Sequence, residues 1–361
     1  MATLYLDREH VQLRLDGDAL VMRNEAGERI ATVPLQPLRR ILVRGNVSFD
    51  SRCLGKLGER GIGVLILRGR HPRATLMLPA RHHDATRRMA QYRASFDPAF
   101  CLQTARRWVD EKCERQIHYL AQLQVNRPDA RLPLTRALRS LRSIRDSVGG
   151  SGHIDQLRGL EGAAARQEFQ AYAALLPPSI GFAERNRRPP RDPYNAVISL
   201  AYTLLYAEAQ LAAHDAGLDP AVGLYHQPAF AHEALASDLM DPERPRLNFW
   251  AQRAFAHQCL RSEDFRTSEH GCMLGKAGRA RFYRSFESLT EGMRAGLRRR
   301  CQNLIAAFGL DAEAATVALD RRDTCTGEDG PDADADAAAA LASDITDVAP
   351  ADAGENTGDH A

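Results

Sequence analysis

The chain lacks the short motifs that mark several large enzyme classes. It has no Gly-x-x-x-x-Gly-Lys-Ser/Thr loop, no Gly-x-Ser-x-Gly elbow and no His-Glu-x-x-His helix. These absences argue against P-loop nucleotide hydrolases, α/β-hydrolases and the common zinc proteases. The seven cysteines are scattered and form no Cys-x-x-Cys pair, which argues against a zinc ribbon and a disulfide framework. We therefore expect reduced thiols and a cytoplasmic protein.

The chain also lacks a long hydrophobic run and an N-terminal signal pattern. It begins Met-Ala-Thr-Leu-Tyr-Leu-Asp, without the basic segment and apolar run of a signal peptide. Its most apolar long stretch, residues 196–213, includes Glu208 and Gln210 and is short for a membrane span. We expect this stretch to form a buried core helix, and we expect no association with a membrane.

Lysine is scarce, and the charge is unevenly distributed. The only lysines are Lys56, Lys112 and Lys276, so arginine supplies the other positive charge. Residues 309–361 carry fourteen acidic and two basic residues, whereas residues 1–308 carry 46 basic and 32 acidic residues. A body this basic indicates a polyanionic partner such as nucleic acid, and the planar arginine fork suits phosphate. A solvated arginine-rich surface in a GC-rich genome would explain the same charge.

The spacing of apolar residues predicts an α+β fold that begins with a β-rich domain. Residues 1–80 read as a small β-sandwich-like domain with a short helix over residues 51–59. The strands are expected at residues 3–6, 10–15, 19–22, 29–35, 40–43, 63–67 and 73–78. Residues 81–97 are polar and rich in arginine, and we assign them to a linker. Its His82-His83-Asp84 sequence could bind a metal ion or belong to a basic segment that contacts phosphate.

The remainder of the chain predicts a helical domain and a tail. Residues 98–308 read as an all-α domain. Its helices are expected at residues 98–125, 132–147, 153–175, 193–216, 229–240, 247–260 and 278–307. Residues 309–361 are rich in alanine, aspartate and glycine and contain no aromatic residue, which predicts a disordered acidic tail.

Two acids that follow a histidine are the first candidates for a functional site. Asp238 and Asp241 come twelve and fifteen residues after His226. Acids three apart share one face of a helix, where two carboxylates repel each other unless a cation lies between them. Carboxylates and an imidazole are ligands that a divalent cation accepts. On its own, His226 reads as a structural or surface histidine, and Asp238 and Asp241 read as ordinary acids at a helix start. His232-Glu233 offers a competing ligand pair.

A third acid, Glu161, lies within the helix predicted over residues 153–175. Gly162 beside it is a poor helix former, costing about 1 kcal/mol relative to alanine. We interpret this glycine as a position where another backbone or a ligand approaches closely. An exposed helical glutamate is the alternative interpretation of Glu161.

Several blocks in a fixed order give the chain a family likeness. The blocks are Gly-Leu-Glu161-Gly, Arg188-Pro-Pro-Arg-Asp-Pro-Tyr-Asn195, Gly217-Leu-Asp-Pro-x-x-Gly-Leu-Tyr-His226 and Asp238-Leu-Met-Asp241-Pro. Over residues 1–307 the chain resembles the CRISPR-associated spacer-acquisition integrase of the adaptation module. The acidic tail lies outside this resemblance.

The resemblance implies a catalytic metal site with Glu161, His226 and Asp241 as ligands of Mg²⁺ or Mn²⁺. Many relatives carry glutamate at the position of Asp241, so the aspartate reaches one methylene less far. Asp238 lies in or beside the site as a further ligand, a partner of His226 or a group that faces DNA. Asn195 matches an asparagine that contacts either the helix start or the rim of the site.

The resemblance also implies the reaction and the partners. The protein would insert a prespacer duplex into a CRISPR repeat by transesterification from a 3′-hydroxyl, as part of antiviral defence. It would form a homodimer through the β-rich domain and assemble with a small companion adaptation protein. From position and charge we assign phosphate contacts to Arg87, Arg88, Arg185, Arg187, Arg188 and Arg191. The alternatives are a structure-specific metal nuclease that acts on branched DNA and a non-catalytic DNA-binding scaffold.

Overall fold

Eight strands form two four-stranded sheets at the start of the chain, in a computed structural model that describes residues 2–68, 73–79, 85–186, 189–230 and 232–310. The first sheet has the order β1-β5-β7-β8, with β8 antiparallel to β7 and the other pairs parallel. Its strands are β1 (Ala2–Asp7), β5 (Leu38–Arg44), β7 (Gly63–Arg68) and β8 (Arg73–Met77). The second sheet has the order β4-β3-β2-β6, with β6 parallel to β2 and the other pairs antiparallel. Its strands are β2 (Val11–Asp16), β3 (Ala19–Arg23), β4 (Arg29–Pro34) and β6 (Val47–Phe49).

The two sheets share one apolar core, in agreement with the expected β-rich N-terminal region. Strand β2 alternates, so that Val11 and Leu13 are buried while the residues between them are exposed. Leu4 and Ile41 of the first sheet join the same core. Helix α1 (Ser51–Glu59) packs its buried Leu57 against this core. The sequence predicted seven of these strands and the helix, and it missed only the short β6.

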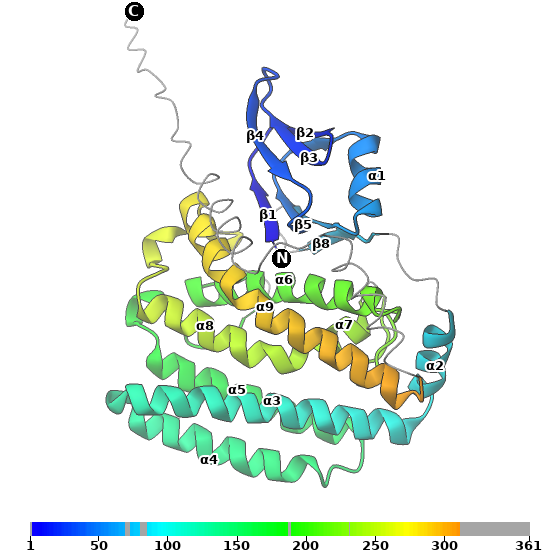
Figure 1. Cartoon of the computed structure of the whole chain (residues 1–361). Coiled ribbons are helices and arrows are strands. Elements are labelled where there is room, and N and C mark those ends of the chain that lie inside the picture. Colours follow the sequence, from blue (N-terminus) through cyan, green and yellow to red (C-terminus); the bar gives the residue numbers. More distant parts are fainter. Residues whose placement is uncertain (1, 69–72, 80–84, 187–188, 231, 311–361) are drawn as a thin grey trace, which may run out of the picture.

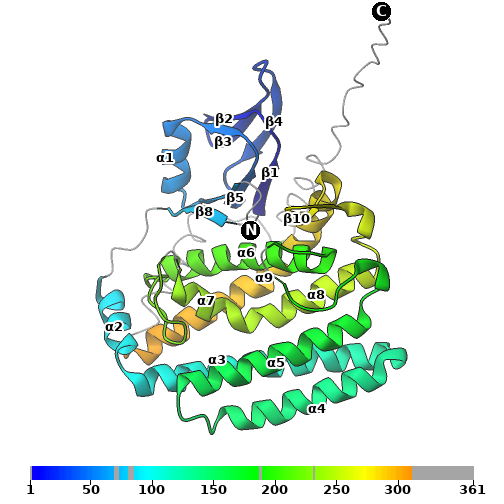
Figure 2. The same ribbon diagram turned by 180° about the vertical axis from the view of Figure 1, so that it is seen from behind.

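Helices build most of the rest of the described chain. They are α2 (Ala85–Ser95), α3 (Pro98–Asn126), α4 (Arg131–Val148), α5 (Ile154–Leu175), α6 (Pro193–Asp215), α7 (Ala234–Met240), α8 (Arg244–Ala256) and α9 (Lys276–Ala307). Four short 3₁₀ turns connect them, η1 (Pro128–Ala130), η2 (Pro178–Ile180), η3 (Asp241–Glu243) and η4 (Ser262–Asp264). Helices α3, α4 and α5 form an outer layer, and α6, α8 and α9 lie between that layer and the β-rich part (Figures 1 and 2).

Helix α6 is the core helix that the apolar stretch predicted. Asp192 caps its start by accepting the N–H of Asn195 at 2.8 Å, and Pro193 is the first helical residue. Gly217, with a φ of 74°, follows its end. Among the described residues, α6 is long and apolar enough to cross a membrane, but 72% of its most apolar window is buried inside the protein.

Helix α2 occupies most of the segment predicted as a linker over residues 81–97. The amide of Gln91 donates to the carbonyl oxygen of Asp219 at 2.9 Å and accepts the N–H of the same residue at 2.8 Å. These bonds fix α2 to the loop after α6, so the described part of the segment predicted as a linker packs against the helices. Residues 80–84, with the predicted His-His-Asp cluster, lie outside the described residues.

The helical part is not all-α, which corrects the prediction from sequence. Strands β9 (Phe265–Ser268) and β10 (Gly271–Leu274) form an antiparallel hairpin. The N–H of Cys272 donates to the carbonyl oxygen of Pro190 at 2.7 Å, a contact between segments far apart in the chain. Gly271 has a φ of 104°, and a Cβ there would lie 2.6 Å from the same oxygen.

The helix predicted over residues 229–240 begins only at Ala234. Ala229 and His232 instead form an isolated bridge, with the N–H of His232 donating to the carbonyl oxygen of Ala229 at 3.1 Å. The hydroxyl of Tyr206 accepts the N–H of Glu233 at 2.7 Å and so fixes the point where α7 starts. A tight turn therefore precedes α7, which corrects this boundary.

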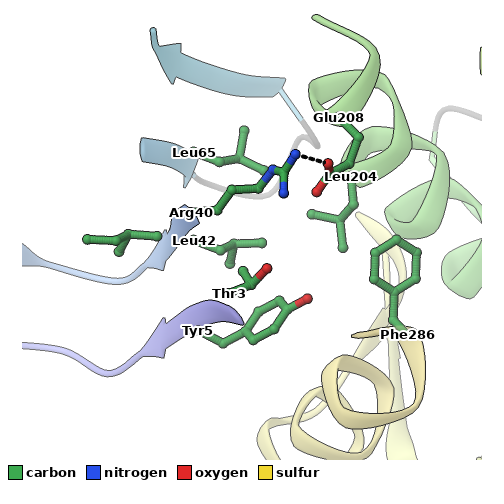
Figure 3. A pocket seen from close by; sticks show the side chains of 9 residues that line it. Thr3, Tyr5, Arg40, Leu42, Leu65, Leu204, Glu208 and Phe286 are labelled. Carbon is green, nitrogen blue, oxygen red and sulfur yellow. Dashed lines mark ion pairs between the residues drawn. The ribbon is translucent and has the colours of Figure 1, made fainter. Parts of the chain in front are cut away.

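A buried ion pair joins the β-rich part to the helices. Arg40 of β5 lies 2.5 Å from Glu208 of α6, which also pairs with Arg294 of α9 at 3.0 Å. Figure 3 shows the Arg40–Glu208 pair between sheet residues and the apolar side chains of Leu204 and Phe286. Each carboxylate oxygen of Glu208 thus has a charged partner at a largely buried junction.

Candidate active site

Four segments bring the predicted site residues together in the helical part. Glu161 lies on α5, opposite Lys112 on α3. His226 lies in the loop between α6 and α7, and Asp241 is the first residue of η3. The side chain of His226 is 30% exposed and that of Asp241 is 6% exposed. The site is therefore buried at Asp241 and open to solvent at His226.

The loop before His226 is folded around the carboxylate of Asp238, a fully buried residue of α7. Its Oδ2 accepts the N–H groups of Leu224 at 2.7 Å and Tyr225 at 3.0 Å. Its Oδ1 accepts the N–H of His226 at 2.8 Å and lies 2.7 Å from the ring Nδ1. A carboxylate at this position keeps a proton on Nδ1, so Nε2 is left to face Asp241, whose Oδ2 is 4.0 Å away.

Gly223 is required for this close approach. A Cβ at this position would lie 2.7 Å from the carbonyl oxygen of His226, 2.8 Å from Oδ2 of Asp238 and 2.9 Å from Cβ of Ala234. The loop and the start of α7 therefore touch with no room for a side chain between them.

Lys112 lies between the two acids of the site. Its ammonium donates a short hydrogen bond to Oε1 of Glu161 and lies 3.5 Å from Oδ2 of Asp241. The hydroxyl of Tyr225 donates to Oε2 of Glu161 at 2.6 Å. Arg244 brings Nε within 2.7 Å of Oδ1 of Asp241, but this ion pair lacks the angle of a hydrogen bond.

Burial and charge shift the pKa values of these groups in opposite directions. Burial lowers the pKa of Lys112, but Asp241 and Glu161 outweigh it and raise that pKa to about 12. Burial raises the pKa of Glu161, but the charge of Lys112 and several hydrogen bonds hold it well below the usual range. Burial raises the pKa of Asp241 despite the neighbouring cations. For His226, burial is outweighed by the bond to Asp238 and by nearby negative charge, so its pKa is raised.

The donor set fits a divalent cation. Glu161, Asp241 and Nε2 of His226 supply two carboxylates and one imidazole, a combination that suits Mn²⁺ and is acceptable to Mg²⁺. Both oxygens of Asp241 are buried without a directed hydrogen bond, so each keeps a lone pair for a ligand. Within the described ranges, no three acidic, histidine or cysteine side chains are close enough to hold a metal ion as they stand. The ammonium of Lys112 lies where such ligands would have to meet.

Asp238 does not fit the prediction that it is a further metal ligand. Its oxygens bind three backbone N–H groups and the ring of His226, and its side chain has no exposed surface. Because the side chain of Asp238 is completely buried, it cannot be a group that faces DNA. The geometry supports the remaining alternative, in which Asp238 is a partner that orients His226.

Two of the arginines assigned to phosphate make contacts inside the protein. Arg87 is buried, and its guanidinium donates to the carbonyl oxygen of Ala216 at 3.0 Å. Arg185 is half-buried and donates to Oδ1 of Asn195 at 2.8 Å. These contacts hold α2 and the start of α6 in place, and the assignment of both residues to DNA stays a prediction.

The other four arginines stay predictions. Arg191 is exposed and Arg88 is half-buried on α2. Arg187 and Arg188 lie outside the described residues.

Asn195 and Gly162 also have clear surroundings. The side chain of Asn195 donates to Oδ2 of Asp192 at 2.6 Å and to the carbonyl oxygen of Glu184 at 2.9 Å, so it stabilises the start of α6. A Cβ at Gly162 would meet nothing within 4 Å. No described backbone approaches Gly162, which corrects the interpretation of that glycine as a point of close protein contact.

Sequence reasoning missed three residues of the site, namely Lys112, Tyr225 and Arg244. One signal was available for Lys112, because it is one of only three lysines among 48 basic residues. A lysine at a position where the chain otherwise uses arginine indicates a need for a compact ammonium. Tyr225 lies inside the block that ends at His226, but no role was assigned to it, and Arg244 follows Asp241 by three residues outside any block.

The fold and the site define a class of two-part protein, in which a β-rich part is joined to a helical part that carries a carboxylate–imidazole centre. The family model described as "CRISPR associated protein Cas1" matches residues 4–288. The CRISPR-associated endonuclease Cas1 1 of Thermodesulfovibrio yellowstonii is 32% identical over 297 residues, which are 81% of this chain and 93% of that relative. The chain therefore belongs to the Cas1 family, which confirms the resemblance inferred from the motif blocks.

Solved structures support the same fold. A casposase bound to an integration product superposes with a TM-score of 0.72 and 21% identity, over 85% of this chain and 91% of its own. A Cas6-RT-Cas1–Cas2 complex gives a TM-score of 0.73 and 24% identity, over 85% of this chain and 35% of the matching chain. At these identities, the likeness concerns the arrangement of the helices and strands.

Proposed function

We propose that this Cas1-family protein is a divalent-metal-dependent DNA integrase and endonuclease. It inserts prespacer DNA into a CRISPR array when a prespacer 3′-hydroxyl attacks a phosphodiester of the repeat. One observation carries the proposal: Asp238 fixes the ring of His226 so that Nε2 faces Asp241, at a centre that Glu161 completes. Family membership supports the reaction class, since its curated relatives are named endonucleases.

Glu161, His226 and Asp241 are the proposed ligands of Mn²⁺ or Mg²⁺. When bound, the metal would polarise the attacking hydroxyl and stabilise the added negative charge of the transition state. The chain itself prepares these ligands. Asp238 keeps the Nδ1 proton in place, and Tyr225 holds one oxygen of Glu161.

DNA and a companion protein are the proposed partners. The excess of 46 basic over 32 acidic residues in residues 1–308 supports a polyanionic substrate. The matched structures contain a casposase on an integration product and Cas1 with Cas2. By the same resemblance, we propose a homodimer formed through residues 1–80, a catalytic domain over residues 98–308 and a cytoplasmic location.

Two rival functions make different predictions. A structure-specific metal nuclease would cut branched DNA but would not join a prespacer to a repeat. A DNA-binding scaffold would not depend on metal and would tolerate His226→Ala. The buried bond between His226 and Asp238 favours an enzyme, because a scaffold has no need to orient the ring of a half-buried histidine.

A strand-transfer assay tests the proposal, with a repeat-bearing plasmid, a labelled prespacer duplex and Mn²⁺. We expect Glu161→Gln to abolish joined product while DNA binding stays within about twofold, because the variant removes a ligand but not the basic surface. Glu114→Gln is the matched control, since Glu114 is a 59% exposed acid of α3 away from the site. Normal integration by Glu161→Gln would refute the site.

A further inference from the structure

The candidate site contains its own counter-ions. Lys112 pairs with Glu161 and lies 3.5 Å from Asp241, while Arg244 lies 2.7 Å from the other oxygen of Asp241. The Lys112 side chain is only 8% exposed, so its ammonium has little access to water. In the absence of metal, these two cations offset the charges of Glu161 and Asp241.

Lys112 and a metal ion need the same carboxylate oxygens. A divalent ion that binds Glu161 and Asp241 would lie within a few ångströms of the ammonium, where two positive charges repel strongly in a buried site. A buried cation that loses its carboxylate needs another anion. Lysine suits such an exchange, because its ammonium ends a flexible four-carbon stem, unlike the rigid fork of arginine.

The opening of the site gives an anion from outside the protein access to Lys112. Tyr225 already donates to Oε2 of Glu161, and Arg244 forms an ion pair with Oδ1 of Asp241 without a directed hydrogen bond. The site opens to solvent beside His226, so a new anion has to enter from there. For an enzyme that acts on DNA, the anion that enters this opening is a phosphate of the substrate.

We propose that Lys112 is a positioning residue that couples metal binding to DNA binding. In the metal-free protein it holds Glu161 and Asp241 in place of the metal. When metal and DNA are both bound, its ammonium transfers from Glu161 to a non-bridging oxygen of a substrate phosphate. This inference rests on the proposed function, because it assumes that Glu161 and Asp241 bind metal.

The coupling has a thermodynamic consequence. DNA stabilises the state in which Lys112 has left Glu161, so DNA raises the affinity for metal. By linkage, metal raises the affinity for DNA by the same factor. A purely structural Lys112 predicts no such coupling through its side chain.

Binding of Mn²⁺ to the full chain, followed by electron paramagnetic resonance, tests the coupling. The titration is made with and without a prespacer duplex that ends in 3′-dideoxynucleotides, so that no chemistry occurs. In the wild type, we expect the duplex to lower the Kd for Mn²⁺ by about tenfold, within the usual range of such couplings. We expect Lys112→Met to bind Mn²⁺ more tightly than the wild type without DNA, and to respond to DNA by less than about twofold.

Three controls separate the explanations. Lys56→Met removes a lysine of α1 in the β-rich part and should titrate like the wild type. Lys112→Gln keeps a hydrogen-bond donor and should behave like Lys112→Met, and it replaces that variant if the latter fails to fold. Glu161→Gln should lose Mn²⁺ binding with and without DNA.

The outcomes are distinguishable. Unchanged or weaker Mn²⁺ binding by both Lys112 variants without DNA, or a DNA effect equal to that of the wild type, would overturn the coupling and leave the metal site intact. A wild type that binds no Mn²⁺ in either state would overturn the proposed metal site and the coupling with it.

Discussion

Asp238 holds His226 at two points, accepting its backbone N–H at 2.8 Å and lying 2.7 Å from its ring Nδ1. The same carboxylate also binds the N–H groups of Leu224 and Tyr225. One buried side chain therefore fixes both the backbone path and the ring orientation of the histidine.

Asp238→Asn is expected to loosen this loop. The asparagine amide has the same size as the carboxylate. Because both oxygens of Asp238 face N–H donors, the NH₂ group of asparagine has to replace one of these acceptors and leaves at least one N–H without a partner. Loss of a charged acceptor costs about 1.5–3 kcal/mol of stability. We expect lower thermal stability, faster amide hydrogen exchange at residues 224–226 and weaker strand transfer.

Asp219→Asn is the matched control for that variant. Asp219 also accepts a backbone N–H in a loop, from Ala221 at 2.9 Å, but it does not contact His226. Hydrogen exchange at residues 224–226 that stays as slow in Asp238→Asn as in this control would contradict the organising role of Asp238.

The junction between the two parts should be sensitive to Glu208→Ala. The variant leaves Arg40 and Arg294 buried without their shared carboxylate. Breaking a buried pair by removing one partner costs about 3–5 kcal/mol, and we expect a loss of this size in urea unfolding. Glu59→Ala removes the exposed partner of Lys56 and should cost less than about 1 kcal/mol. Equal losses in the two variants would show that the junction carries no special stability.

A pH-dependent effect is expected at Glu168, a buried residue of α5. Its Oε2 accepts the amide of Gln116 at 2.8 Å, while its Oε1 has no described partner. Burial raises the pKa of Glu168 above the usual glutamate value of 4.5 and outweighs the opposite effects of Gln116, Asn248 and Lys112. The folded state therefore binds this proton more tightly than the unfolded state, and stability is lost as the pH rises from about 4.5 through the folded pKa.

Glu168→Gln should remove that loss, because an amide stays neutral and can donate to the unpaired oxygen of Gln116. We expect the variant to match the wild type near pH 4 and to melt at a higher temperature at pH 8, in thermal scans across this range. Glu114→Gln on α3 serves as the exposed control. A stability difference between Glu168→Gln and the wild type that does not change with pH would contradict this account.

Local sequence signals predicted those elements that local interactions determine. Asp192, Pro193 and Gly217 define α6 without help from distant residues, and the alternation of Val11 and Leu13 defines β2. The same signals predicted a helix over residues 229–240. The hydroxyl of Tyr206, on α6, instead accepts the N–H of Glu233, and α7 begins only at Ala234. The β9–β10 hairpin was missed because its anchor, the Cys272–Pro190 bond, spans distant segments.

The candidate site was predictable to the extent that its residues fall in motifs. Glu161, His226 and Asp241 were found by the order of the blocks, and the structure brings them to one place. The role of Asp238 was left open, because only the fold shows that its oxygens face backbone N–H groups. Lys112 lies in no motif, and its role depends on how α3 packs against α5.

The hydrogen bonds between Asp238 and His226 do not involve the turn that connects the two residues along the chain. No described residue between 227 and 232 forms a hydrogen bond to His226, whose position is set by α7 directly. The exposed residues 227–230 can therefore be exchanged without displacing the histidine, whereas the ring of His232 lies edge-on to that of His226, with centroids 6.1 Å apart. The turn lies beside the opening of the site, so it is a place where descendants of this protein could gain new substrate preferences while the chemistry is inherited unchanged.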